Sequence, residues 1–143
     1  MPLIAGIPVV SWIVGKGECF APGGGVTALG WVKEGKIVAG VMYEEFTEAS
    51  IHATIVVEEG NMIGKELLFT MFDYPFRQLG ANKIIVQVNT ANAESVNLAK
   101  RLGFTEEGMI KGAYLDGDRI ILTMTKDECR WLKELENEIS KDA

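Results

Sequence analysis

Cysteine and histidine are scarce in this sequence, since its 143 residues include two cysteines and one histidine. Cys19 and Cys129 lie far apart, and no Cys/His cluster has the spacing of metal ligands. We therefore expect no metal site. Reduced thiols in the cytoplasm are the favoured interpretation of the two cysteines, although the sequence alone leaves a disulfide between them open.

Long apolar runs and an excess of positive charge are also absent. No stretch approaches the roughly 20 apolar residues of a membrane span, and the segment "MPLIAGIPVVSW" lacks the basic residues that begin a secretory signal. The formal net charge of −6 disfavours non-specific binding to nucleic-acid phosphates and suits a cationic or amine-bearing partner. These features predict a cytoplasmic protein that binds neither membrane nor nucleic acid.

The chain does have the composition of a globular domain, with 48% hydrophobic residues. Its length falls within the usual size of one domain, and neither a linker nor an internal repeat divides it. We expect a single α+β (mixed α/β) domain over residues 1–143. It begins with a helical region, residues 1–25, and ends with a helix, residues 126–143.

The first half of the chain predicts one short helix and three strands. Pro8 suits the first residue of a short helix at "PVVSWIVGK", because its missing N–H costs nothing there. The stretch "VTALGWVKEGKIVAGVMYEEF" is typical of two strands joined by a tight turn at Glu34 and Gly35. "IHATIVVE" is a third strand after the turn "TEAS", so the short links indicate an antiparallel meander.

Helical periodicity follows in "IGKELLFTMFDYPFRQLG", where apolar residues recur with the spacing of one helix face. Gly80 marks the end of this helix, and Pro75 predicts a kink in its last turn. "KIIVQVN" is a short apolar run, expected to form a strand buried on both faces. The order of strand, helix and strand predicts a right-handed parallel crossover between "IHATIVVE" and "KIIVQVN".

The last third predicts two helices around a hairpin. Asn92 can cap a helix over "AESVNLAKRL", which ends at the following glycine. Strands over roughly 107–115 and 118–125 meet at Asp116 and Gly117, a strong hairpin signal. "KDECRWLKELENEIS" is a polar helix with one apolar side, expected to pack on its own domain.

The loop in "EEGNMIGKELL", residues 58–68, leads from the third strand into a helix. Unpaired N–H groups at a helix N-terminus, together with the helix dipole, can hold a pyrophosphate. Gly64 would allow the backbone to approach an anion, and Lys65 would add positive charge. The alternative is an ordinary strand-to-helix turn that uses glycine for positive φ, and the loop alone favours that alternative.

A second segment, "NTANAESVNLAKRLGFTEEG", carries a more specific pattern. It resembles the signature of the GNAT superfamily of acetyl-CoA-dependent N-acetyltransferases, roughly N-x-x-S-x-x-L-x-x-x-L-G-F-x-x-E-G. The matching residues are Asn92, Ser95, Leu98, Leu102, Gly103, Phe104, Glu107 and Gly108. The order of elements from about Val26 to Thr125 also resembles that fold. "DYPFRQLGANKI" and "DECRWL" are similar to short phage- or prophage-encoded members and to the ribosomal-protein type.

The resemblance implies a three-layer fold, in which the meander leads into a splayed pair of parallel strands with helices on both faces. It implies acetyl-CoA as cosubstrate and direct transfer of the acetyl group to a small-molecule or peptide amine. The pantetheine arm would pair with the exposed edge of the first parallel strand, whose N–H groups can stabilise an oxyanion. The cofactor contacts that it implies are Val56, Val57, Gly60, Asn61, Met62, Ile63, Gly64, Lys65, Asn92 and Ser95.

The sequence departs from the family pattern at three positions. Glu59 and Met62 stand where the loop Q/R-x-x-G-x-G/A has Gln or Arg and a glycine, and a carboxylate at its entrance repels phosphate. Ala99 stands where many members have a tyrosine that protonates the departing thiolate. A thiolate whose conjugate acid has a pKa near ~8.5 leaves without much help. These departures motivate a second hypothesis, a catalytically impaired GNAT-like scaffold that serves as a binding or assembly module. A different nucleotide-binding α/β protein is a third hypothesis, which the early meander disfavours.

Transfer to an amine also needs a group that accepts a proton. Glu58, at the end of the third strand, is the first candidate, with a solvated strand-end residue as the alternative. His52 lies on the same strand face, about 20 Å away at ~3.3 Å per residue, and a lone histidine in a strand is more often structural. Residues 1–25 have room for about one of the two helices that wall the acceptor site in the family. The resemblance therefore implies an open pocket, or one that a second copy completes in a homodimer.

Overall fold

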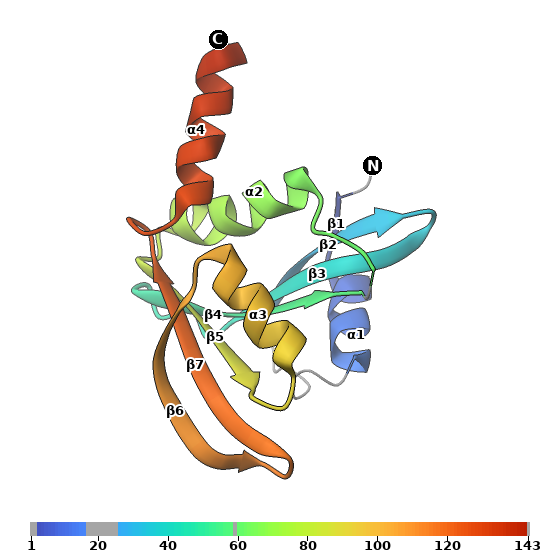
Figure 1. Cartoon of the computed structure of the whole chain (residues 1–143). Helices are drawn as coiled ribbons and strands as arrows, with labels where there is room; N and C mark the ends of the chain where they lie inside the picture. Colours follow the sequence, from blue (N-terminus) through green and yellow to red (C-terminus); the bar gives the residue numbers. More distant parts are fainter. Residues whose placement is uncertain (1–2, 17–25, 59, 143) are drawn as a thin grey trace.

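The computed structural model describes residues 3–16, 26–58 and 60–142, so Cys19 and Glu59 lie outside the described part. A mixed sheet of seven strands forms its centre, in the order β1-β2-β3-β4-β5-β7-β6 (Figure 1). The elements are β1 (Leu3–Ala5), α1 (Ile7–Gly15), β2 (Thr27–Lys33), β3 (Lys36–Glu44), β4 (Ser50–Val57), α2 (Lys65–Asp73), the π-helical turn η1 (Tyr74–Gln78), β5 (Lys83–Asn89), α3 (Ala93–Leu102), β6 (Thr105–Tyr114), β7 (Gly117–Thr125) and α4 (Arg130–Asp142). The expected α+β class is confirmed.

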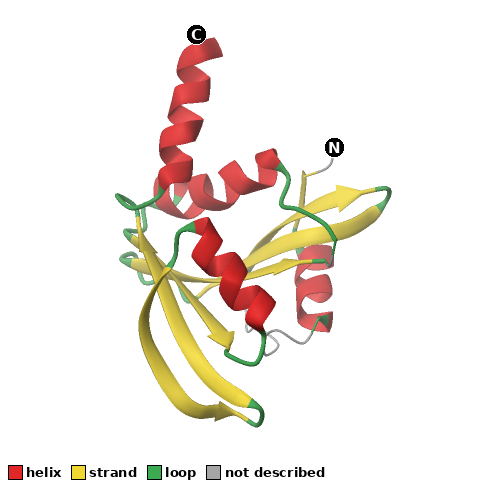
Figure 2. Cartoon of the chain, in the orientation of Figure 1, coloured by secondary structure: helices red, strands yellow, loops and turns green. Residues whose placement is uncertain are grey.

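Helices cover both faces of the sheet, so the fold has the three expected layers (Figure 2). On one face, side chains of α2, α3 and the start of α4 share the larger hydrophobic core with β3, β4, β5 and β7. On the other face, Val9 and Ile13 of α1 pack on Ala28, Met42 and Val56. Within the described residues, no helix is long and apolar enough to cross a membrane.

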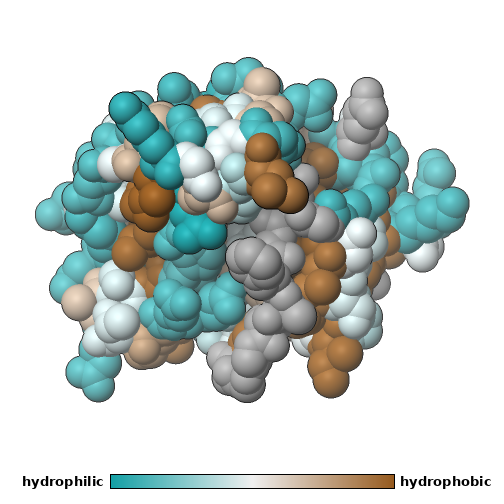
Figure 3. Space-filling model, turned by 90° about the horizontal axis from the view of Figure 1, so that it is seen from below, coloured by the Kyte–Doolittle hydropathy of each residue, from teal (hydrophilic) through white to brown (hydrophobic). Residues whose placement is uncertain are grey.

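The helix α1 lies close to the sheet because β2 and β3 present glycines to it. A Cβ built on Gly30 would lie 2.8 Å from a methyl carbon of Val9, so only glycine fits there. The helix α1 begins at Ile7, so Pro8 is its second residue and not the first, as was expected; the first turn still leaves its missing N–H without cost. The strand β1, which pairs antiparallel with β2, was not predicted. Seen from below (Figure 3), the described hydrophobic side chains lie in separate patches among hydrophilic ones.

The meander β2-β3-β4 is antiparallel, as predicted, and its first turn contains Glu34 and Gly35 with φ angles of 53° and 77°. The strand β5 then pairs parallel to β4. Only the pairs from Ser50 with Lys83 to His52 with Ile85 are formed, after which the two strands diverge. The splayed pair is therefore present.

One face of β5 is less buried than predicted. Ile84 and Val86 are buried in the larger core, but Ile85 and Gln87, which alternate with them, are half-buried. The expectation that both faces are buried was wrong, because α1 packs chiefly on β1, β2 and β3.

The helix α2 changes to the π-helical turn η1 at Tyr74, and η1 contains Pro75, where a kink was expected. Proline has no N–H, so it cannot bond to the carbonyl of Met71, four residues earlier. The buried hydroxyl of Tyr43 donates a hydrogen bond of 2.5 Å to that carbonyl instead. Burial raises the pKa of Tyr43 well above its ordinary value, which keeps this hydroxyl protonated as a donor.

The hairpin β6–β7 turns at Leu115 and Asp116, one residue earlier than predicted. Gly117 belongs to β7, where a Cβ would overlap the side-chain oxygen of Asn89 and lie 3.0 Å from that of Thr90. The glycine therefore allows close packing and does not supply a turn with positive φ.

The helix α4 packs on the domain at its start and then projects outward (Figure 1). Leu132 is buried, and the indole N–H of Trp131 donates a 2.8 Å hydrogen bond to the carbonyl of Leu102. Further along α4, Glu136 forms an ion pair with Arg77 of η1, and Glu138 forms one with Lys65 of α2.

Candidate functional site

A groove of about 610 Å³ lies between the β4–α2 loop and α3. It begins where β4 and β5 have separated, so one wall is the end of β4 and the opposite wall is a face of α3. All but two of the residues predicted to contact the cofactor line this groove: Val56, Val57, Gly60, Asn61, Met62, Ile63, Asn92 and Ser95.

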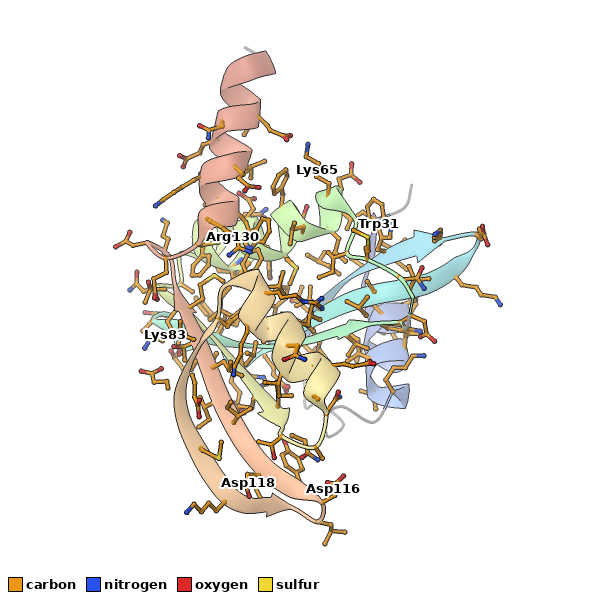
Figure 4. The ribbon with its side chains drawn as sticks, viewed as in Figure 1. Trp31, Lys65, Lys83, Asp116, Asp118 and Arg130 are labelled. Atoms are coloured by element: carbon orange, nitrogen blue, oxygen red, sulfur yellow. The ribbon has the colours of Figure 1, made fainter. Side chains whose placement is uncertain are left out.

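The two exceptions are Gly64 and Lys65, which do not line the groove. Lys65 is the first residue of α2 (Figure 4). A Cβ on Gly64 would overlap the indole ring of Trp31, so this glycine allows the loop to pass over that ring. Lys65 forms an ion pair with Glu138 of α4. The sequence suggested Gly64 and Lys65 as anion contacts, but in the structure Gly64 packs against Trp31 and the Lys65 side chain pairs with Glu138.

The loop nevertheless retains the backbone features of an anion site. Gly60 has a φ of 81°, the left-handed conformation that favours glycine, and the N–H of Asn61 donates to the carbonyl of Glu58 at 3.0 Å. The N-cap residue Gly64 provides no side-chain cap for α2. The first N–H groups of this nine-residue helix therefore lack intrahelical partners and carry its positive dipole end.

The edge of β4 presents backbone groups to the gap between the splayed strands. The N–H of Glu58 donates to Val38 of β3 at 2.7 Å, and backbone direction alternates along a strand. Ala53, Ile55 and Val57 therefore direct their N–H and C=O groups toward β5, with which β4 no longer pairs. Of the two positions expected at this edge, Val57 fits, whereas the backbone of Val56 points toward β3.

A small hollow of about 30 Å³ lies between β4, β5 and α3, deeper than the groove. Ala53, Thr54 and Gln87 line its strand side, and Ala99 lines its helix side. Where the sequence resemblance implies a tyrosine, this wall has the methyl group of Ala99, and the hydroxyl-bearing Ser95 lines the same wall.

The helix α3 is positioned by a strong local cap. The side chain of Asn92 accepts a 3.2 Å hydrogen bond from the N–H of Ser95, and the helix ends at Gly103 with a φ of 112°, both as predicted. The sequence analysis missed Arg101, which brings a positive charge to the groove. Glu94, Asn97 and Arg101 have the spacing of one helix face, and this signal could have identified the wall.

The two predicted proton acceptors lie at opposite ends of β4. Glu58 lines the groove and forms an ion pair with Lys16, which follows α1. His52 lies at the end where β4 still pairs with β5, and its Nδ1 is 3.7 Å from Oε1 of Glu44. Burial lowers the pKa of His52 most, Glu44 and Glu45 raise it, and Arg119 lowers it. Among the described residues, no group of three or more His, Cys, Asp or Glu side chains could hold a metal ion.

Comparisons with known proteins agree with this arrangement. The family described as "Acetyltransferase (GNAT) domain" matches residues 27–125. The SPbeta prophage-derived uncharacterized N-acetyltransferase YokL of Bacillus subtilis is 33% identical over 75 residues, which cover 48% of this chain and 41% of YokL. This chain thus aligns with less than half of that relative.

Solved structures share the fold at low identity. Spermidine N-acetyltransferase SpeG of Vibrio cholerae, as its F149A mutant, superposes with a TM-score of 0.73 at 15% identity, covering 94% of this chain and 99% of SpeG. N-acetyltransferase PseH of Campylobacter jejuni, in complex with acetyl coenzyme A, gives a TM-score of 0.57 at 15% identity, covering 73% of this chain and 70% of PseH.

Proposed function

The chain belongs to the GNAT family of acetyltransferase domains, and on that premise we propose that it is an acetyl-CoA-dependent N-acetyltransferase. The observation that carries this proposal is the separation of β4 from β5 after three residue pairs, with a groove at the open end. Such a gap accepts an extended arm beside β4, and the groove accepts the nucleotide end.

The groove fits acetyl-CoA in size and in the groups that it presents. About 610 Å³ lies within the range of roughly 300–1,000 Å³ of small-molecule sites. The N–H groups at the start of α2 suit the pyrophosphate. Arg101 adds the positive charge that Lys65 does not bring to the groove. Asn92, Ser95 and the predicted loop residues that line the groove remain our proposed contacts.

The edge of β4 would serve both binding and chemistry. The pantetheine amides can pair with the backbone of Val57 and Ile55 as a further strand would. N–H groups on this edge can also stabilise the oxyanion that forms when an amine attacks the thioester. Ala99 offers no proton to the departing thiolate, whereas Ser95 on the same wall carries a hydroxyl.

We assign the acceptor to small-molecule or peptide amines. The net charge of −6 suits a cationic amine, and SpeG, which shares the fold, is named for spermidine. Homodimer formation, which would complete an acceptor pocket, and a cytoplasmic location remain predictions.

Calorimetric titration with acetyl-CoA tests the proposed binding site. We expect binding by the wild-type protein and at least tenfold weaker binding by Arg101→Glu, because a charge-assisted hydrogen bond contributes about 1.5–3 kcal/mol. Lys100→Glu is the matched control, since it makes the same charge change on the exposed side of α3 and should bind normally. Gly64→Glu is a poorer probe, because it would displace Trp31.

Turnover separates an enzyme from a scaffold. Release of CoA thiol should rise when spermidine, hydroxylamine or a peptide that begins with alanine is added with acetyl-CoA. Binding without turnover of any of these amines would favour the catalytically impaired scaffold. A lack of binding at millimolar acetyl-CoA would contradict both the enzyme and its proposed site.

A further inference from the structure

The length of the pantetheine arm locates the reaction centre on β4. About thirteen bonds separate the phosphorus at the start of the arm from the thioester sulfur, as many as in about four residues of extended chain, or ~15 Å. With the pyrophosphate in the groove beside Val57, an arm that runs back along β4 places the thioester near Ala53 or Thr54. These two residues line the hollow between β4, β5 and α3.

The amine must reach this centre from the face of the sheet opposite α3, because α3 closes the other side of the hollow. Side chains alternate between the two faces along a strand. Ala53 lies in the core under α2 and α3, whereas Val56 lies in the core under α1. His52 and Thr54 therefore lie on the face from which the amine approaches.

His52 has an acidic cross-strand neighbour on that face. Glu44 of β3 is directly opposite His52 of β4, and the carboxylate Oε1 lies 3.7 Å from the ring Nδ1. The two side chains are only 24% and 15% exposed, respectively. A carboxylate on this side of the ring favours the tautomer with hydrogen on Nδ1, which leaves the Nε2 lone pair available.

We propose that His52 accepts the proton of the attacking amine and that Glu44 is the residue that positions its ring. This inference rests on the acetyltransferase function proposed above. It assigns the proton transfer to the end at which β4 and β5 still pair, and not to Glu58, at the end where the two strands have separated.

The step balances without any further reactant. The amine attacks in its neutral form, after its ammonium form has lost a proton to solvent. Its nitrogen forms a bond to the acyl carbon, and one proton of that nitrogen moves to Nε2 of His52. The C–S bonding pair departs with sulfur as the thiolate. The imidazolium that results is stabilised by Glu44 and later returns its proton to solvent or to the thiolate.

The surroundings of His52 suit a proton acceptor near neutral pH. Burial holds its pKa below the ordinary value, so the ring is neutral before the amine arrives. The charged groups that act on it are Glu44 from β3, Glu45 from the following turn and Arg119 from β7. Ile85 of β5, its parallel partner, is uncharged.

Glu58 is a weaker candidate in the same geometry. It lies four residues beyond Thr54, or about 13 Å along the strand at ~3.3 Å per residue. Its carboxylate is also paired with Lys16.

Nuclear magnetic resonance of the imidazole ring tests the assignment, because His52 is the single histidine of the chain. Saturating acetyl-CoA should shift the ring signals, and CoA without its acetyl group should shift them less. Glu44→Gln should lower the pKa of the ring, because Glu44 raises it. Glu48→Gln, a neighbouring glutamate outside the pair, is the control and should leave that pKa unchanged.

Kinetics with the fastest of the three amines named above supply the second readout. His52→Gln should lower kcat by roughly 10²–10⁴-fold, the usual contribution of a general base, with an unchanged Kd for acetyl-CoA. Glu44→Gln should move the acid limb of the kcat/KM profile to lower pH, which a purely structural role would not do.

The outcomes separate the two proposals. Absence of acetyl-CoA binding overturns the acetyltransferase function itself. Binding in the groove that leaves the ring signals of His52 unmoved overturns the assignment of His52 alone. Loss of turnover in Glu58→Gln, with turnover retained in His52→Gln, also overturns the assignment of His52.

Discussion

Trp31, which is distant in sequence, leaves no room for a side chain at Gly64. Its φ of −62° is available to any residue, but a Cβ there would overlap the ring of Trp31 on β2. The position therefore couples the β4–α2 loop, which lines the proposed nucleotide site, to the packing of the meander.

Gly64→Ala should destabilise the protein by about 1–3 kcal/mol, the usual cost of overpacking. The urea unfolding midpoint measures this loss. Gly15→Ala is the control, because a Cβ at that position of α1 meets no atom within 4 Å. Adding Trp31→Leu to Gly64→Ala should recover part of the loss, and strict additivity of the two changes would contradict the proposed overlap.

At the scale of elements, the junction between α2 and η1 depends on one hydroxyl. Tyr43 of β3 donates to the Met71 carbonyl that Pro75 leaves without its helical partner. This bond also fixes α2 to the centre of the sheet, so the start of α2 at the groove is supported from its far end.

Tyr43→Phe should lower the free energy of unfolding by about 1–3 kcal/mol, because it leaves a buried carbonyl unsatisfied. Tyr74→Phe is the matched control. The Tyr74 hydroxyl makes only a part-buried contact of 3.4 Å with Thr27, so its loss should cost much less. Equal losses from the two substitutions, measured by denaturant unfolding, would contradict this account.

Elements with strong local signals were predictable from the sequence. Asn92 caps α3, and Glu34 with Gly35 forms the first turn, because both depend on neighbours within a few residues. Positions whose role depends on contacts with residues distant in sequence were not predictable. The role of Gly117 depends on Asn89, in another strand. The three-residue β1 is too short to show a period of its own.

The candidate site was likewise predictable only in part. The family pattern of α3 indicated which loop and helix form the groove, and most of the predicted contacts line it. The sequence could not show that Lys65 pairs with Glu138 on α4, since 73 positions (138 − 65) separate them. It also could not rank His52 against Glu58, because this ranking depends on where β4 and β5 stop pairing.

At the scale of the whole molecule, the central claim is that the gap between β4 and β5 receives acetyl-CoA, with its nucleotide end in the groove. Amide-proton shifts during titration with acetyl-CoA test this claim most directly. The account predicts that the largest shifts occur at Ile55, Val57 and Ser95 and in the loop over residues 60–65. Saturable binding with these amides unmoved and the shifts concentrated elsewhere, for example on β6, would contradict it.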